Sequence, residues 1–324
     1  MKMSRWIVVM ALGAATSVTF AQTWPTAKPI RLIVGYPPGG GIDFAARTVQ
    51  MPLQEAIGQQ IVMDYKPGAG GTIAAAELTR AAPDGYTLLL ANTGPFAIAP
   101  YLQKRMPYDP ITQFTYIGQI SLGSYVAVTR IDHPARDMKE WVAWAKQNAN
   151  SGKVNFASGG SGTSTHLNGE LMNQTTGLDV THVPYKGSAP AIQELIGGQT
   201  QLLIDAGSIL IPQVKGGKLK ALAVTGTKRD PQLPDVPTVR ELGLQGMEAV
   251  GFQGLVAPMG LPADITQKLS AALNKVLAQP DVQAKFASAG AEVHPLGPTE
   301  FSAFVKRDNA KWSALIRERK LQVD

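Results

Sequence analysis

The sequence predicts an α/β protein whose chain is divided between two lobes. From Ile30 onward, a short β-branched strand, a Gly/Pro-rich loop and a helix alternate many times. This alternation is typical of βα units built on a parallel sheet. The chain has 324 residues, 44% of them hydrophobic, which is enough for two domains of ordinary size with separate cores.

The first predicted unit shows the pattern. Strand Ile30–Val34 precedes a Gly/Pro loop at 37–41, and helix Ile42–Ile57 follows with apolar residues spaced to cover the sheet. The other predicted strands are Ile61–Asp64, Thr87–Ala91, Tyr125–Thr129, Val154–Ser158, Val180–Val183, Leu202–Ile204 and Ala221–Thr225. The other predicted helices are Thr72–Ala81, Met138–Asn148, Ser164–Thr176, Ala189–Gly197, Pro262–Ala278, Pro280–Ala289 and Pro298–Glu318.

Two extended segments are predicted to cross between the lobes. They are Phe114–Val128 and the apolar stretch Ala249–Pro258. If the chain leaves the first lobe and later returns, lobe 1 is discontinuous, about 22–124 plus 252–324, and lobe 2 is continuous, about 125–251. Two connecting strands of this kind can act as a hinge.

The first residues have the layout of a cleavable secretory signal. Lys2 and Arg5 precede an apolar stretch, Trp6–Ala15, and small residues follow up to Ala21. The apolar stretch is too short to span a bilayer comfortably. We therefore expect residues 1–21 to be removed near Ala21, and the mature product to be soluble and exported.

Composition excludes several classes of site. The chain has no cysteine, which rules out disulfides, thiolate nucleophiles and cysteine metal sites. Its four histidines lack paired metal-ligand spacing, so no metal site is expected. The formal charge of +6 is spread among acidic residues along the chain, whereas a nucleic-acid binder would gather its basic residues into a patch with aromatics.

Four loops rich in glycine and hydroxyl residues are the candidate ligand site, two in each predicted lobe. They span residues 36–41, 66–72, 157–165 and 184–188. In open α/β sheets, ligands bind outside the carboxyl ends of the strands, where helix N-termini present unpaired N–H groups. The predicted site is therefore an anion site made largely of backbone. The alternative for each loop is a simple tight turn.

Several side chains near these loops allow two interpretations. Asp43 either caps its helix or helps to organise the ligand, and Asn92 and Thr93 either donate to the ligand or close a turn. Asp205, at the end of an apolar strand, could orient a water, a loop or a cationic ligand group, or cap a loop. His166 could face the cleft or be a packed imidazole.

No catalytic signature is present. The sequence lacks a GxSxG elbow, and its Gly loops match neither GxGxxG nor GxxxxGK[ST]. Ser158, Ser161 and Ser164 could act as nucleophiles only if a base such as His166 came within reach.

The chain resembles the substrate-binding proteins of tripartite tricarboxylate transporters, the Bug-type periplasmic receptors, over essentially its whole mature length. The matching stretches are Tyr36–Arg47 (YPPGGGIDFAAR), Lys66–Ala75 (KPGAGGTIAA), Pro83–Leu90 (PDGYTLLL), Val183–Leu195 (VPYKGSAPAIQEL) and Lys215–Thr225 (KGGKLKALAVT). The resemblance implies a Venus-flytrap fold of type II-like form, a periplasmic location, no cofactor, and delivery of a small carboxylate to a membrane permease.

By position, the resemblance also implies ligand contacts from both lobes. They are Tyr36, Pro38, Gly39, Gly40, Asp43, Gly70, Gly71, Ser158, Thr163, Ser164, Tyr185, Gly187, Ser188 and Asp205. Asn92 and Thr93 are added as candidates, although Asn92-Thr93-Gly94 departs from the serines that relatives often carry here.

The predicted function is therefore capture of a dicarboxylate, tricarboxylate or aromatic acid by a monomeric receptor. A secreted α/β hydrolase that uses a serine of the 158–164 loop is one alternative. A ligand-binding accessory of a sensor kinase is the other.

Overall fold

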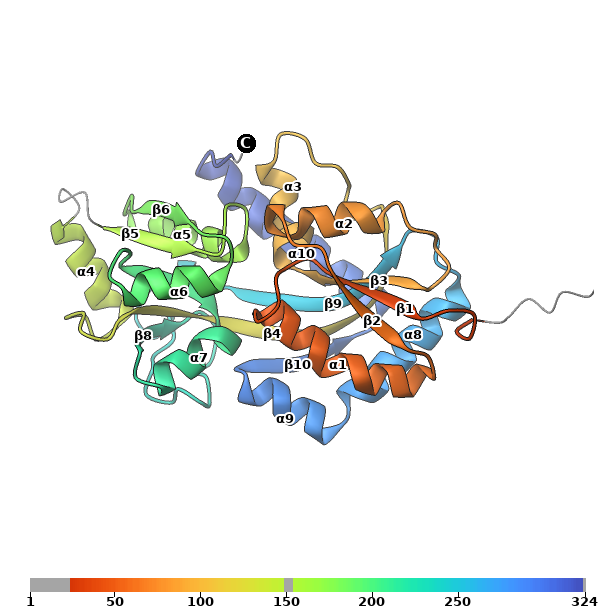
Figure 1. Ribbon diagram of the computed structural model, residues 1–324. Helices are drawn as coiled ribbons and strands as arrows, with labels where there is room; N and C mark the ends of the chain where they lie inside the picture. The colour runs from red at the N-terminus through yellow and green to blue at the C-terminus, as the bar shows by residue number, and fades with distance from the viewer. Residues whose placement is uncertain (1–23, 149–153, 323–324) are drawn as a thin grey trace, which may run out of the picture.

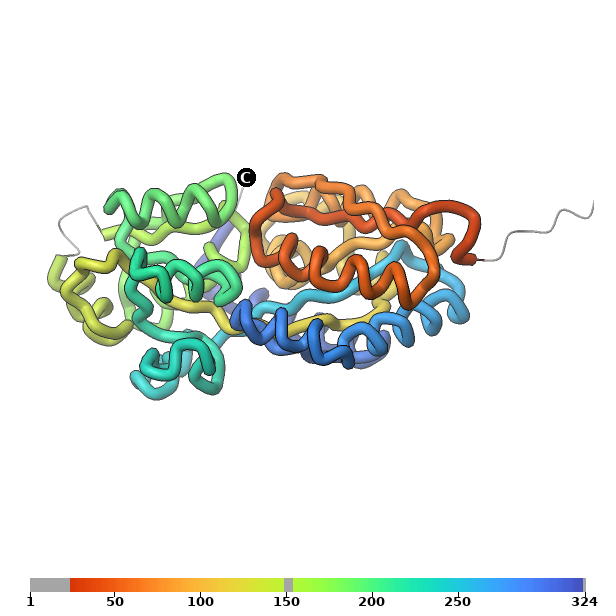
Figure 2. Tube along the Cα trace, turned by 60° about the horizontal axis from the view of Figure 1, so that its bottom comes forward, coloured from red at the N-terminus to blue at the C-terminus, as the bar shows by residue number. Residues whose placement is uncertain are grey.

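The computed structural model describes residues 24–148 and 154–322, which form two lobes joined by crossing strands (Figure 1). The predicted signal segment 1–21 lies outside the described residues. Figure 2 shows the green chain of one lobe on one side, and the orange and blue chain of the other lobe opposite it. The two-lobed α/β prediction is confirmed.

The lobe that contains the N-terminal residues is built from both ends of the chain. Its elements up to the first crossing strand are β1 (Ile30–Val34), α1 (Gly41–Ile57), β2 (Ile61–Tyr65), η1 (Ala69–Gly71), α2 (Thr72–Leu78), β3 (Thr87–Asn92), η2 (Gly94–Ile98) and α3 (Ala99–Leu102). Its elements after the chain returns are α8 (Ala263–Leu277), α9 (Pro280–Ser288), β10 (Ala291–Leu296) and α10 (Pro298–Glu318).

The other lobe is formed by one continuous stretch of chain. Its elements are α4 (Met138–Asn148), β5 (Asn155–Ser158), α5 (Ser164–Thr176), β6 (Thr181–Pro184), α6 (Ser188–Ile196), β7 (Leu202–Ala206), α7 (Gly207–Lys215), β8 (Leu219–Val224) and η4 (Gln245–Met247).

Two strands connect the lobes. β4 (Phe114–Arg130) pairs with β9 (Val250–Pro258) and β10 along its first part, and with β7 and β8 along its last part. The resulting order is β2-β1-β3-β9-β4-β7-β5-β6. β4 and β9 are the two crossing segments that the sequence predicts, and they run antiparallel to each other because one leaves the first lobe and the other returns to it.

The sheet is mixed, and this corrects the expected parallel sheet. β1, β2 and β3 pair in parallel, as do β5, β6 and β7. The crossing strands are antiparallel to the neighbours that they meet in each lobe.

Apolar side chains cover both faces of the sheet. Buried residues of α1, α8 and α9 pack against β1 and β3, and Trp312 of α10 and Trp141 of α4 are fully buried on the other core. The elements that the sequence analysis did not predict are η1, η2, α3, α7, η4 and β10. Helix α7 contains Pro212, and a proline inside an apolar run argues against a helix in sequence analysis.

Candidate functional site

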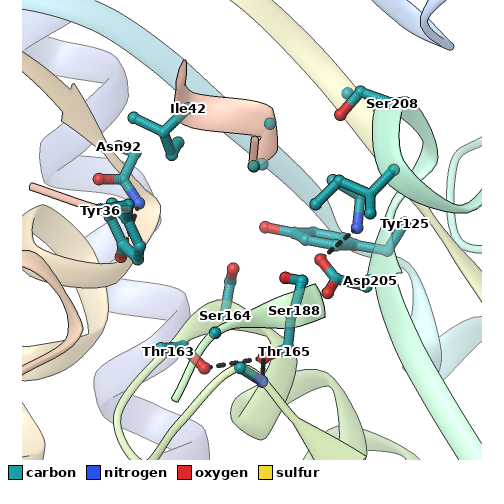
Figure 3. Close-up of a pocket in the computed structure, with 18 of the residues that line it drawn as sticks. Tyr36, Ile42, Asn92, Tyr125, Thr163, Ser164, Thr165, Ser188, Asp205 and Ser208 are labelled. Carbon is teal, nitrogen blue, oxygen red and sulfur yellow. Dashed lines mark hydrogen bonds between the residues drawn. The ribbon is translucent and has the colours of Figure 1, made fainter. Parts of the chain in front are cut away.

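A cavity of about 470 Å³ lies between the two lobes. The loop at 36–41 and residues Asn92 and Thr93 form its wall on the first lobe, and residues 163–165, 186–190 and 205–209 form its wall on the second. The crossing strands add Ser121 and Tyr125 from β4 and Gln253 from β9. Figure 3 shows labelled side chains of both walls pointing into the same space.

Four helices begin at this cavity. The first residues of α1, α5, α6 and α7 all line it. The opening turns of a helix leave backbone N–H groups without partners inside the helix, and the helix dipole makes that end positive. Four such ends around one space are the kind of arrangement that can bind an anion. Three of the four predicted loops line the cavity, and the loop at 66–72 does not. The fourth helix start at the cavity is that of α7, which the sequence analysis did not predict.

The loop at 66–72 contacts Tyr36 and not the cavity. The Tyr36 hydroxyl donates to the Gly70 carbonyl at 2.7 Å and accepts from the Asn92 side-chain amide at 3.2 Å. Gly71 packs against the Tyr36 ring, where a β-carbon would lie 3.1 Å from the ring carbons. Gly70 and Gly71 therefore do not line the cavity, and they support Tyr36 instead.

The half-buried Tyr36 is a neutral hydrogen-bonding group. Burial raises the pKa of Tyr36 to about 12, although the hydrogen bond from Asn92 acts in the opposite direction. Thr93 is held by the second crossing strand, because its hydroxyl accepts from the Phe252 backbone N–H at 3.0 Å. Asn92 and Thr93 both line the cavity.

Asp43 is placed behind the 36–41 loop and not on the cavity. Its carboxylate accepts from the Gly39 N–H at 2.9 Å, from the Tyr65 hydroxyl at 2.5 Å and from Arg47 Nε at 2.9 Å. Burial acts to raise the pKa of Asp43, but these hydrogen bonds outweigh it and lower the pKa. Gly39 has φ +91°, a conformation that favours glycine, so this carboxylate holds an unusual turn in place.

Hydroxyl groups dominate the start of α5. Thr163 is the N-cap residue; its hydroxyl donates to the Gly160 carbonyl at 2.6 Å and accepts from the His166 N–H at 3.4 Å. Thr165 accepts from the Gly159 N–H at 2.8 Å. These bonds fix the loop, and Thr163, Ser164 and Thr165 all line the cavity.

Ser158 lies beneath this wall. It is fully buried, and its Oγ is 2.6 Å from His182 Nε2. The His182 ring stacks on His166 with centroids 3.9 Å apart, so His166 is a packed imidazole. Burial lowers the pKa of His166 to about 4 and that of His182 to about 3, the latter with help from His166. Ser158, predicted as a ligand contact, does not line the cavity.

The loop before α6 is joined to the loop before α5. The Gly187 N–H donates to the Gly159 carbonyl at 3.1 Å, and the Tyr185 N–H donates to the Ser158 carbonyl at 3.0 Å. Gly187 has φ +109°, which again favours glycine, and it lines the cavity together with Ser188. Tyr185 does not line it, because its side chain packs on the lobe's hydrophobic core near Glu194.

Asp205 ends strand β7 at the cavity. It is 3% exposed, and its Oδ1 accepts from the Ala206 N–H at 2.7 Å. Its buried Oδ2 has no hydrogen-bond donor among the residues that the structure describes. Burial raises the pKa of Asp205 to about 6, while the Ser188 hydroxyl and the Ala206 N–H act in the opposite direction.

Most of the predicted site residues meet around one space. Those that line the cavity are Tyr36, Pro38, Gly39, Gly40, Asn92, Thr93, Thr163, Ser164, Gly187, Ser188 and Asp205. Those that do not are Asp43, Gly70, Gly71, Ser158 and Tyr185. Sequence reasoning missed Tyr125, Ser121 and Gln253, whose only signal was their position on the crossing strands, and Ser208, which follows Asp205 at the start of an unpredicted helix.

Within residues 24–148 and 154–322, no group of three or more His, Cys, Asp or Glu side chains is placed to hold a metal ion. The same described part of the chain contains no helix long and apolar enough to cross a bilayer.

The fold and the site define a two-lobed solute-binding protein with its ligand cavity between the lobes. The family model for the tripartite tricarboxylate transporter family receptor matches residues 45–321. The chain therefore belongs to this receptor family, and its resemblance to the Bug-type receptors is confirmed.

Three solved structures give the scale of the similarity. The periplasmic binding protein BugD is 35% identical, with a TM-score of 0.85 over 91% of this chain and 99% of its own. MatC (Rpa3494) from Rhodopseudomonas palustris, with bound malate, is 31% identical, with a TM-score of 0.84 over 90% and 99% of the two chains. Rpa4515 from R. palustris, with adipate, is 30% identical, with a TM-score of 0.85 over 91% and 98%.

Proposed function

We propose that this protein captures a small carboxylate in the periplasm and delivers it to the membrane permease of a tripartite tricarboxylate-type transporter. The observation that carries the proposal is the convergence of four helix N-termini on one cavity between two lobes. Such an arrangement binds negative charge through backbone N–H groups and needs no cofactor. Because α1 comes from one lobe and α5, α6 and α7 from the other, one anion bound to both walls would favour the closed arrangement.

The relatives support a carboxylate ligand. MatC was solved with malate and Rpa4515 with adipate, both of them dicarboxylates. The cavity of this chain has a single cationic lining residue among those described, the exposed Lys186. Helix N-termini would therefore provide most of the positive potential that a carboxylate requires.

Lobe movement would follow the two crossing strands. We place lobe 1 at 22–124 plus 252–324 and lobe 2 at 125–251, so that β4 and β9 form the hinge. The lobes approach closely at two points that support a closed state. A β-carbon on Gly70 would lie 3.7 Å from the Ser161 and Gly162 carbonyl oxygens, and one on Gly41 would lie 2.8 Å from Ser208 Oγ.

A thermal-shift screen of residues 22–324 against mono-, di- and tricarboxylic and aromatic acids tests this function. A ligand that binds only the folded state stabilises it and so raises the melting temperature. At a ligand concentration of a hundred times Kd, the stabilisation is about 2.7 kcal/mol. We expect at least one acid to give such a shift and to be recovered chemically unchanged. A flat response across all acids would contradict the proposal.

The hydrolase alternative meets one favourable observation, the 2.6 Å contact between Ser158 Oγ and His182 Nε2. The serine is fully buried and does not line the cavity, and its oxygen also accepts from the Gly160 N–H at 3.1 Å. The pair therefore fits a role in holding the loop together better than one in attacking a substrate. Turnover of a bound ester or amide that Ser158→Ala abolishes would favour the enzyme instead.

A further inference from the structure

Among the residues that the structure describes, one buried carboxylate oxygen of the cavity has no hydrogen-bond partner, although the Ser188 hydroxyl lies beside the same carboxyl group. Asp205 Oδ2 is buried and lacks a donor among the described residues, while Oδ1 is engaged by the Ala206 N–H. Buried polar atoms in proteins nearly always have a hydrogen-bond partner, and burial without one is costly. Asp205 lines the cavity, so the group that satisfies this oxygen can belong to the ligand.

The protein provides no counter-charge for Asp205. In the part of the chain that the structure describes, no Lys, Arg or His side chain forms an ion pair with this residue, and the only cationic lining residue is the exposed Lys186. Figure 3 shows Asp205 beside Ser188 and Tyr125, facing the same space as the polar groups of the opposite wall. The aspartate is therefore a feature of the cavity and not of a salt bridge elsewhere.

Asp205 stands next to helix N-termini that attract anions. Helix α7 begins two residues after it, and Ser188 at the start of α6 lies beside it. A ligand carboxylate held by these helix ends comes close to a second negative charge. The repulsion is relieved when a hydrogen-bond donor on the ligand lies between the two carboxylates, since hydrogen bonds to ionised groups are among the strongest in proteins.

We propose that Asp205 recognises a hydrogen-bond donor on the ligand, so that the site prefers small carboxylates bearing a hydroxyl or ammonium group near the carboxylate over unsubstituted acids of the same length. This inference rests on the proposed function. It assigns different tasks to two kinds of group: the helix N-termini bind the carboxylate, and Asp205 selects among carboxylates.

The test is a calorimetric measurement of Kd for residues 22–324 with two matched series. The first is propanoate, lactate and alanine, and the second is succinate, malate and aspartate. Within each series only the substituent at the second carbon changes. Sites built to bond a polar ligand group reject analogues that lack it by large factors, so we expect a substituted acid to bind at least about 30-fold more tightly than its parent in one series.

Two variants assign the preference to the residue. Asp205→Leu keeps the branched shape of the side chain without an acceptor, and we expect it to reduce the ratio between substituted and parent acids to within about threefold. Asp205→Asn keeps one acceptor oxygen without the charge, so it should weaken an ammonium ligand at least about tenfold more than a hydroxyl ligand. Asp281→Asn, on the exposed face of α9, is the control and should leave every Kd unchanged.

The outcomes separate the two proposals. If parent acids bind as tightly as substituted ones, or if the preference survives in Asp205→Leu, the role of Asp205 is wrong while carboxylate capture stands. If Asp205→Leu does not fold, the ammonium-to-hydroxyl ratio in Asp205→Asn decides alone, and an unchanged ratio overturns the inference. If no acid of either series or of the wider screen binds, the proposed function fails and the role of Asp205 fails with it.

Discussion

The two walls of the cavity each have an aspartate close to a helix N-terminus, and the two are used in opposite ways. On the first lobe, Asp43 accepts hydrogen bonds from Gly39, Tyr65 and Arg47, and it does not line the cavity. On the second lobe, Asp205 lines the cavity and has one oxygen without a donor in the described part of the chain. Local hydrogen bonds lower the pKa of Asp43, whereas burial raises that of Asp205.

This difference separates two tasks that a binding site must perform. A carboxylate whose oxygens are all hydrogen-bonded within the protein stabilises the loop around it and makes no contact with the ligand. A buried carboxylate with an unoccupied oxygen costs stability in the unliganded protein, and that cost is recovered when a ligand donates to it. Changes at Asp43 should therefore affect all ligands alike, and changes at Asp205 should affect them selectively.

The largest expected effect concerns the pH dependence of stability at Asp205. Because its folded pKa is about 6 and the ordinary value is 3.8, the folded state holds the proton more tightly than the unfolded chain. The contribution of Asp205 to the free energy of unfolding is fully present below its ordinary pKa and is lost as the pH rises through about 6. The total loss is about 3 kcal/mol. Asp205→Asn removes the loss.

Urea unfolding of the unliganded wild-type protein and of Asp205→Asn measures this effect. The pH should run from about 3.5 to about 7, because this range spans the ordinary and the folded pKa of Asp205. The stability of the variant relative to wild type should rise by about 3 kcal/mol across the range. His166 and His182, with their lowered pKa, destabilise both proteins as the pH falls, and they cancel in the difference. A difference that does not vary with pH would mean that Asp205 has a solvated environment.

The next effect concerns Asp43. Asp43→Ala should lower the free energy of unfolding by about 2–3 kcal/mol, because it leaves the Gly39 N–H, the Tyr65 hydroxyl and Arg47 without their shared acceptor. Affinity should fall by a similar factor for every acid, since the 36–41 loop loses its shape. Calorimetry across the substituted and parent acids gives the result, and a change in preference among them would break the contrast with Asp205.

A smaller effect is expected where α10 reaches the second lobe. Arg319 donates to Glu170 of α5 at 3.1 Å, and the Glu170 side chain is only 9% exposed. Arg319→Gln should weaken every ligand by about fivefold to 30-fold, because an unpaired buried carboxylate at the closed interface costs about 1–2 kcal/mol. The double variant with Glu170→Gln should recover most of the loss. Additive losses would show that the pair does not couple the lobes.

The smallest effect sharpens the comparison within the first wall. Tyr65→Phe removes one of the donors to Asp43 and keeps the Gly39 and Arg47 contacts. We expect a loss of about 1 kcal/mol in unfolding free energy, the usual value for one hydrogen bond. Affinities should stay within about twofold, because the turn at Gly39 is retained. A loss as large as that of Asp43→Ala would make Tyr65 the main support of the loop.

Local sequence patterns were sufficient for most of the secondary structure. β1, α4, α5 and α10 have the predicted bounds, and the crossing segments are β4 and β9. Strand and helix periodicities, glycine turns and helix start signals act over a few residues, so they are visible without knowledge of the fold. The same holds for Asp205, whose position at the end of an apolar strand placed it at the ligand edge of the sheet.

Only the tertiary structure decided which of the candidate groups meet. Gly70 and Gly71 belong to a glycine loop like the others, but Tyr36 lies between them and the cavity. Ser158 faces a buried histidine, and the start of α7 joins the site although its proline obscured it. The reason is that a side chain's access to a cavity depends on register and packing between strands distant in sequence, such as β4 with β7 and β9, and no local pattern contains that information.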